Sequence, residues 1–473
     1  MNKVVLIAIV LYALGKWAYL NWQGKRSNHM LTSFFVLMLA FDFGTSFHSF
    51  LTKTNYEGTM VDRLGVFGNS LWISLSTFVI PIGFFLGYQR FPVLKLKDYK
   101  WELVVLVMSL IAIFNPMNPY PKSVLIFLCY ALQVFLAVNY IKGNFTQGEV
   151  LKGVYDGLMV ITVLQTVLVI MYPLLGIEAA LTFFKGEDMI DYALKREGYT
   201  SAVGIFGHPG TLALFSLITA IFFLSAYLNG FKKQFSLYCF LANVFIILLT
   251  FSRTTYVTSA IIIGIVLISF YSKKSLFSIK NVILASTVFA TFLGILYLTP
   301  LSELFLASDF ENQIEVRFSS WFMGYDIWSR AKLLGVGINA HVYYMGHFIR
   351  VTQDLAVVEF ITTNPIHNIH LIVLAETGIV GIVLWLSFFG SKISSHTKLL
   401  KTNNIVVNVF SLATIGILIS IFIYGFFGWA PLKREMITLT FLIGQVHVFK
   451  TYSHRSVQNY KVQQPEFTQQ LVN

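Results

Sequence analysis

The chain has 473 residues, of which 56% are hydrophobic and only 12% carry a charge. Soluble domains carry about a quarter charged residues, so this composition excludes an ordinary water-soluble protein. The two cysteines, Cys129 and Cys239, both lie inside apolar stretches, which argues against a disulfide framework and against a zinc site.

Long apolar stretches recur from one end of the chain to the other, and each can cross a hydrocarbon core of about 30 Å. They are continuous and do not alternate with polar residues, so they predict helices and not the strands of a barrel. We expect an all-α polytopic membrane protein with about 12–14 transmembrane helices. The first stretch has no small-residue cleavage site, which favours a retained helix over a removable signal peptide. The expected helices span about 4–20, 30–50, 69–88, 102–116, 122–141, 154–176, 209–229, 236–252, 254–271, 281–299, 367–388, 405–428 and 435–449.

The connections between these helices differ in charge, and the difference predicts the topology. Alternate connections are rich in Lys and Arg, and the positive-inside rule places them in the cytoplasm. Residues 300–366 then form one large external loop, and residues from about 177 to 208 form a second one. The net charge of +12 is mainly a signal of topology and gives little support to nucleic-acid binding. The basic connections are QGKRSN, YQRFPVLKLKDYK, IKGNFTQGEVLK, GFKKQ, YSKKSLFSIK, SKISSHTKLLK and the C-terminal tail.

The large external loop is expected to contain short amphipathic helices. Its segments LSELFLASDF and FSSWFMGYDIW mix apolar and charged residues, as is typical of segments at a membrane interface. Polar chemistry is easier to assemble in a loop than against lipid, so the functional side is expected to be the external one.

Two arginines are candidates for chemistry. Arg253 is the single charged residue between Lys233 and Lys273. This isolation at the end of an apolar run favours a functional role over an interfacial anchor. Arg317 lies in the external loop beside acidic residues such as Glu315, so a surface ion pair explains it equally well.

His367 is the candidate general base. It follows Pro365, which disfavours helix just before it, so a helix is expected to begin within a residue or two of the histidine. An imidazole held there could take a proton from a hydroxyl, although an ordinary helix-entry residue is an equally good interpretation. Glu376 lies further into the helix, where a carboxylate is costly unless it is paired, so we expect it to hold a neighbouring helix or the histidine region. Gly378 and Gly381 would allow a close helix contact.

The sequence contains no obvious cofactor motif. His341 and His347 have no carboxylate at metal-site spacing, so no metal is expected. There is no Walker motif, and GVGINAHVYYMG has the glycines of a dinucleotide fingerprint but follows no strand.

Three segments together resemble one family. They are TFSRTTYVTSAIIIGIVLI, VRFSSWFMGYDIWSRAKLLGVGINAHVYYM and HNIHLIVLAETGIVGIVLWL, and they occur in the order typical of the O-antigen ligase and O-antigen polymerase superfamily. The resemblance covers about residues 236–390, while GIFGHPGTLALF is similar to a weaker upstream feature. The pattern does not demand His341 or His347.

The resemblance implies a glycosyltransferase that acts on a glycan attached to undecaprenyl pyrophosphate at the outer face of the bacterial inner membrane. His367 would be the general base, and Arg253 and Arg317 would stabilise the pyrophosphate. No second nucleophile is evident, so direct displacement with inversion is expected. Glu376, Gly378 and Gly381 would give structural support. The substrate-binding residues would be Arg196, His208, Trp321 and Asn368.

The expected organisation has four parts. Residues 1–235 form an N-terminal transmembrane bundle, and 236–390 form the ligase- or polymerase-like catalytic region with the external loop. Residues 391–450 form the C-terminal transmembrane helices, and 451–473 form a cytoplasmic tail. The expected partners are the lipid-linked donor, a glycan acceptor, membrane lipids, and a chain-length regulator and flippase of the same pathway, but no nucleic acid.

Several functions stay open on the sequence. A polymerase would add the growing chain to a new lipid-linked repeat unit, and we favour it. A ligase would use the same donor and transfer the glycan to lipid A core or another final acceptor. A polysaccharide transporter or flippase is the alternative from another class, but it would want broken helices and charges near the middle of the membrane.

Overall fold

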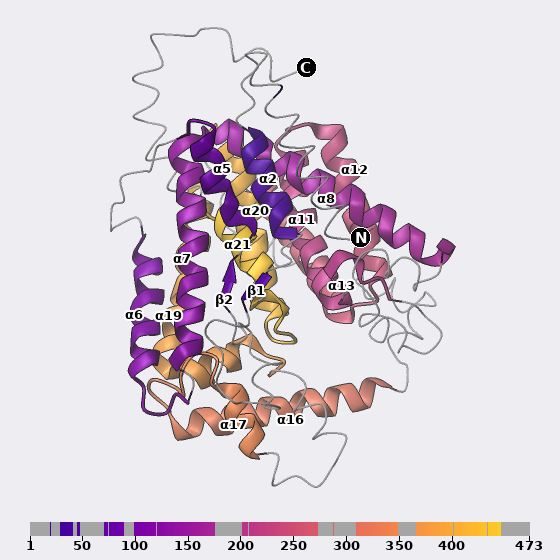
Figure 1. Cartoon of the computed structure of the whole chain (residues 1–473). Helices are drawn as coiled ribbons and strands as arrows, with labels where there is room; N and C mark the ends of the chain where they lie inside the picture. Colours follow the sequence, from indigo (N-terminus) through magenta and orange to yellow (C-terminus); the bar gives the residue numbers. More distant parts are fainter. Residues whose placement is uncertain are drawn as a thin grey trace.

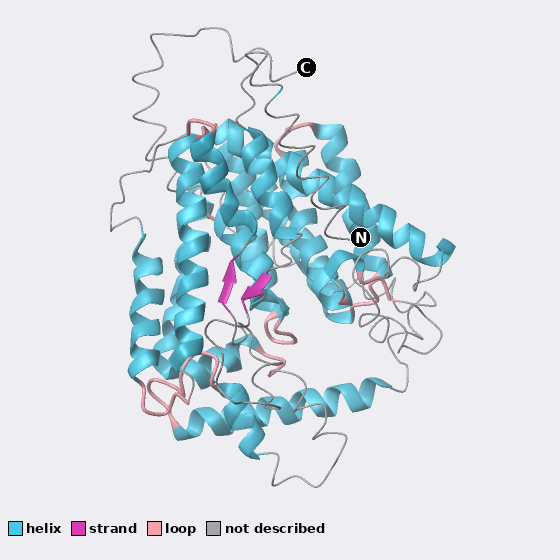
Figure 2. Ribbon diagram, in the orientation of Figure 1, coloured by secondary structure: helices cyan, strands magenta, loops and turns pink. Residues whose placement is uncertain are grey.

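A computed structural model describes residues 19, 29–40, 45–47, 71–73, 75–88, 99–119, 121–175, 201–206, 208–272, 287, 309–348, 366–400, 402–432 and 434–445. Helices dominate the described part of the chain (Figure 2). Six of them are long and apolar enough to cross a membrane. The expectation of an all-α polytopic membrane protein is therefore confirmed, and the chain is a multi-pass membrane protein. The expected helices at 4–20 and 281–299 and the tail fall outside the described residues, except for Tyr19 and Thr287.

The six long apolar helices are α7, α8, α11, α13, α19 and α20. Three of the remaining apolar helices are shorter, and α16 and α17 are different in kind because they come from the expected external loop. The helices with their bounds are α2 (His29–Ala40), α5 (Val79–Phe85), α6 (Lys100–Phe114), α7 (Pro121–Asn144), α8 (Gln147–Leu175), α11 (Pro209–Leu228), α12 (Lys233–Leu249), α13 (Arg253–Ser272), α16 (Asp309–Arg330), α17 (His341–Phe348), α19 (Ile369–Leu399), α20 (Ile405–Tyr424) and α21 (Arg434–Ile443).

Two of the expected helices each contain a short strand in the structure. The stretch 69–88 is divided into the strand β2 (Leu71–Ile73), the 3₁₀ helix η1 (Leu75–Phe78) and α5. The stretch 30–50 ends its helix at Ala40, and β1 (Thr45–Phe47) follows and pairs antiparallel with β2. The aromatic and β-branched residues of these two segments fit a strand, which a count of apolar residues alone does not reveal.

Helix α20 lies at the centre of the C-terminal half and packs against α11, α13 and α19. Its middle is closely packed, because a Cβ added at Gly416 would meet Ile221 of α11 at 2.7 Å and Val266 of α13 at 2.8 Å. Figure 1 shows α16 and α17 lying across one end of this bundle. We call this end the α16 end.

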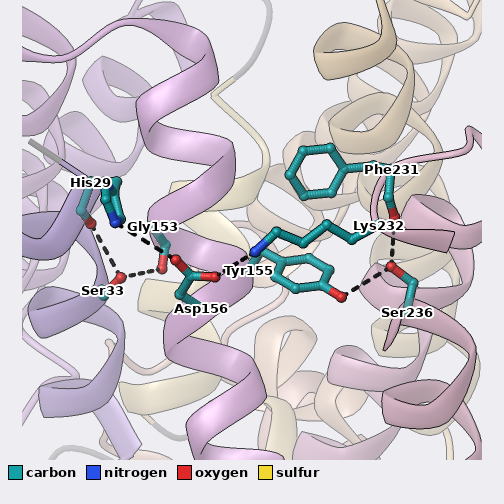
Figure 3. A network of polar contacts seen from close by, with 8 residues as sticks. All are labelled: His29, Ser33, Gly153, Tyr155, Asp156, Phe231, Lys232 and Ser236. Carbon is teal, nitrogen blue, oxygen red and sulfur yellow. Dashed lines mark hydrogen bonds and ion pairs between the residues drawn. The ribbon is translucent and has the colours of Figure 1, made fainter. Parts of the chain in front are cut away.

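The opposite end of the bundle carries a separate polar network (Figure 3). Lys232 lies in the connection between α11 and α12. Its ammonium donates to the carboxylate of Asp156 in α8 at 3.0 Å. The same carboxylate lies 3.8 Å from the imidazole of His29, at the start of α2. The Lys232 ammonium also sits 4.6 Å from the ring centre of Tyr155. These contacts tie three helical segments together near the surface, where each ion pair contributes at most about 1 kcal/mol.

Candidate functional site

Three chain segments meet at the α16 end of the bundle, around the last residue of α20. The backbone N–H of Ile369, the first residue of α19, donates to the carbonyl of Gly425 at 2.8 Å. A Cβ added at Gly210, near the start of α11, would lie 3.2 Å from the Tyr424 hydroxyl. The C-terminal end of α20 therefore adjoins the N-terminal ends of α11 and α19.

Helix α13 adds a third N terminus to this end. The short α11–α12 and α12–α13 connections make α13 parallel to α11, and both pack on α20. Arg253 is the first residue of α13, and beside it the hydroxyls of Ser252 and Thr255 lie 2.8 Å apart. Each helix N terminus carries roughly half a positive charge. Three such ends at one face favour an anionic ligand.

His367 is half-buried and lies just before α19. Its carbonyl accepts from the Trp321 indole N–H of α16 at 3.4 Å. Asn368 is buried in an extended conformation, and its side-chain oxygen caps α19 by accepting from the N–H of Leu371 at 3.0 Å. The helix thus begins two residues after His367, as expected. The amide oxygen of Asn368 is thus used by the cap.

Arg317 lies one turn before Trp321 on α16 and is half-buried. The ring centre of Trp321 lies 6.5 Å from that of Phe427, just beyond α20, so this part of α16 adjoins the end of α20. Helix α16 is held against the start of α19 by this same side, where a Cβ added at Gly324 would lie 3.2 Å from Ile366, just before α19. This packing brings Arg317, Trp321 and His367 to the same end as Tyr424.

Of the other predicted site residues, His208 and Arg253 lie at the α16 end, and Arg196 is not described by the structure. His208 is exposed and caps α11, since its Nδ1 accepts from the N–H of Gly210 at 3.1 Å. It therefore lies beside Tyr424. Arg253 is at the same end of the bundle, in the first turn of a neighbouring helix. Arg196 lies outside the described residues.

His370 has a structural role and is not part of the candidate site. Its Nε2 lies 2.9 Å from the carbonyl of Phe422, and its Nδ1 accepts from the indole N–H of Trp385 at 3.2 Å. Both ring nitrogens are thus engaged inside the helix packing. Among the described residues, no three His, Cys, Asp or Glu side chains are grouped to hold a metal, and the expected metal-free site stays a prediction.

Helix α19 is broken at Gly378, which has φ +65° and ψ −163°. A short segment after α16, residues 331–340, fills the break, and we call it the docked loop. The loop N–H groups of Val336 and Gly337 donate to the carbonyls of Ala375 and Glu376, both at 2.9 Å. The N–H of Ile379 donates in return to the loop, at the carbonyl of Lys332.

The glycines at this junction have roles other than the expected helix contact. A side chain at Gly378 would overlap the backbone of Leu333, and one at Gly335 would overlap the backbone of Glu376. A Cβ at Gly381 would overlap the side chain of Thr377 in its own helix. Gly378 of α19 and Gly335 of the docked loop therefore let the loop backbone enter the break in the helix.

Glu376 pairs with a residue that the motif pattern had not indicated. Its Oε1 lies 2.6 Å from Nδ1 of His341, the first residue of α17. His341 has no exposed surface and only a tenth of the Glu376 side chain is exposed. The Nε2 of His341 and the amide of Asn339 are also buried, and neither has a hydrogen-bond partner among the described residues.

The side of the docked loop that faces away from α19 is tied to the α6–α7 turn by Tyr344 and Asn115. The Tyr344 hydroxyl donates to the carbonyl of Met117 at 2.6 Å, and the Asn115 amide donates to the carbonyl of Gly335 at 2.8 Å. Burial raises the pKa of Tyr344, so its phenol stays protonated as a donor near neutral pH. The α6–α7 turn, the docked loop and α19 therefore form one junction.

A comparison with known families adds to this geometry. A family model described as O-antigen ligase matches residues 238–386. This confirms the resemblance to the O-antigen ligase and polymerase superfamily. The matched region contains Arg253, Arg317 and His367, whereas His208 and Tyr424 lie outside it. No curated protein matches the chain. The match supports a ligase- or polymerase-type function in polysaccharide biosynthesis.

Two residues of this end were missed by sequence reasoning. Tyr424 ends an apolar helix, and no pattern around it distinguishes it from other interfacial tyrosines. His341 directly follows the GVGIN segment, but its partner Glu376 is 35 residues away. The sequence indicated that Glu376 needs a partner, because an unpaired carboxylate inside a membrane helix is costly. It did not identify that partner as His341.

Proposed function

We propose that this protein is a membrane glycosyltransferase that polymerises undecaprenyl-pyrophosphate-linked repeat units, with the α16 end at the outer face of the bacterial inner membrane. The observation that carries the proposal is the convergence of three helix N termini with Arg317, Tyr424 and His367 at one end of the bundle. This arrangement suits a pyrophosphate beside a proton acceptor.

The proposed reaction is a direct displacement at the anomeric carbon. His367 takes the proton from an acceptor hydroxyl as the oxygen attacks this carbon. The bond from the anomeric carbon to the pyrophosphate oxygen breaks, and the electron pair leaves with the pyrophosphate. Arg253 and Arg317 neutralise the charge that develops there, and one displacement inverts the configuration. The lipid carrier keeps its isoprenoid tail in the bilayer throughout.

The broken helix α19 is the observation that favours a transporter as a second candidate, because transporters often bind substrate at breaks of this kind. In this protein, however, the docked loop occupies the break and satisfies its freed carbonyls. The break is therefore a junction of the fold. Transfer to lipid A core or to another final acceptor remains the alternative within the same chemistry.

The test compares His367→Ala with wild type in a strain that lacks the chromosomal copy, at matched protein levels. Lipid-linked and exported glycans are separated by size. Single repeat units left on the carrier support a polymerase with His367 as base. Long chains that stay on the carrier while final attachment is lost identify a ligase. A wild-type glycan profile removes His367 from the reaction.

A further inference from the structure

Helix α16 carries a row of exposed aromatic side chains that the proposed chemistry does not use. Phe318, Phe322 and Tyr325 are 50%, 73% and 58% exposed. Their spacing of four and three residues places them on one face of the helix, one turn apart. We call these three residues the aromatic row. Exposed apolar faces of this kind mark interaction sites.

The aromatic row points away from the body of the protein. The opposite face of α16 contains the buried residues Ser320, Gly324 and Ile327. Gly324 is the point of contact with α19, where a Cβ would lie within 3.3 Å of Leu371. Because buried and aromatic residues lie on opposite faces, the packing that holds α16 in place leaves the aromatic row open.

The row is continuous with the candidate site. Phe318 stands edge-on to Trp321, with ring centres 5.2 Å apart, and Trp321 donates to the carbonyl of His367. Trp321 also adjoins Phe427, just beyond α20, at 6.5 Å. Contacting rings therefore lead from Trp321, beside the proposed base, to Phe318, the first residue of the aromatic row.

The charges of α16 argue against an interfacial membrane helix. Such helices are rich in Lys and Arg, which attract anionic lipids. Helix α16 instead carries the acidic residues Asp309, Glu311, Glu315 and Asp326 against only two arginines. The Asp326–Arg330 pair, at 3.3 Å, is about half exposed and flanks the aromatic row. Rings with polar neighbours suit sugars, which offer flat C–H faces and hydroxyl groups.

We propose that the aromatic row binds the glycan chain of the substrate, with sugar rings stacked along α16 and leading to the site at His367. This inference rests on the proposed function and deepens it. The row would hold sugars beyond the reacting one, so it would govern retention of a long chain and not the transfer step itself.

The test uses the full-length protein in detergent and the glycan that mild acid releases from the lipid carrier of wild-type cells, separated by length. The variant is Phe322→Ala/Tyr325→Ala. The matched control is Phe235→Ala/Tyr238→Ala, which removes an equally exposed aromatic pair from α12. We expect the α16 variant to bind long fragments about tenfold more weakly and to make shorter chains, at an unchanged rate of first transfer.

Four outcomes would contradict the proposal or the function on which it rests. Unchanged affinity and chain length in the α16 variant, or equal losses in the α12 control, show that the row does not bind glycan. A spin label at Phe322→Cys, in a chain with Cys129→Ser and Cys239→Ser, separates glycan from membrane. Greater exposure of this label to oxygen than to a water-soluble nickel chelate assigns the row to lipid. A wild-type protein with no transfer at all contradicts the proposed function instead.

Discussion

The imidazole Nδ1 of His341 lies 2.6 Å from Oε1 of Glu376, and this contact joins the start of α17 to the middle of the broken helix α19. The pair sits where the docked loop enters the break at Gly378. It therefore fixes the first part of α19, and His367 lies just before the N-terminal end of this helix. The position of the proposed base depends on this junction.

The pair is expected to behave as a coupled unit. In Glu376→Ala the Nδ1 of His341 loses its buried partner, which costs about 1–3 kcal/mol of unfolding free energy. The double variant with His341→Ala should lose less than the sum of the two single losses. Unfolding of purified protein measures the coupling. The exposed Asp326–Arg330 pair is the control, for which coupling should stay below about 1 kcal/mol. Additive losses at His341 and Glu376 would contradict a direct pair.

Two glycines of α19 allow a matched comparison. Gly378→Ala places a side chain at a positive φ and against the backbone of Leu333, so the docked loop must move. Gly390→Ala meets no atom within 4 Å in the same helix. We expect Gly378→Ala to lower the melting temperature by several degrees and to reduce glycan synthesis, whereas Gly390→Ala should leave both near wild type. Equal behaviour of the two variants would mean that the break has no structural role.

Replacing Arg253 or Arg317 by lysine should slow transfer even though the positive charge is kept. Lysine supplies one positive charge but not the planar fork of donors of arginine. Arg253→Lys and Arg317→Lys are each expected to slow transfer on the order of 100-fold. Arg330→Lys on the exposed part of α16 serves as the control and should retain its rate. Rates close to wild type in both site variants would assign these arginines to other tasks.

The indole of Trp321 is expected to position the segment before α19. Trp321→Phe removes the N–H that donates to the carbonyl of His367 but keeps an aromatic ring against Phe318. We expect a modest loss of maximal rate, about tenfold or less, with little change in the KM for donor. Trp328→Phe on the same helix is the control, since its indole donates to Lys332 instead. An effect confined to KM would place Trp321 in ground-state binding.

Apolar run length predicted the long helices because the bilayer imposes it, and α11, α13 and α20 begin within a residue of the expected positions. The same criterion is wrong where a short apolar segment forms a strand, as at Leu71–Ile73. Hydropathy does not distinguish an element that spans the membrane from one that only packs within the protein.

The site was predictable only where chemistry is local in sequence. His367 and Asn368 are adjacent, and the preceding proline indicated that a helix begins there. Tyr424 and His341 reach their partners through tertiary packing, because α20 and the docked loop bring together residues that are far apart in the chain. The sequence predicts a helix contact at Gly378, whereas the structure has a break that the docked loop fills. A single sequence does not show which neighbouring backbone lies against a glycine.

The most direct measurement is transfer by purified protein in detergent, given lipid-linked repeat units and no nucleotide, added ion or gradient. We expect wild type to make longer lipid-linked glycan and His367→Ala, folded and at equal concentration, to make none. A wild-type protein that forms no product in detergent, but moves the lipid-linked glycan across sealed vesicles, would contradict it and identify a transporter.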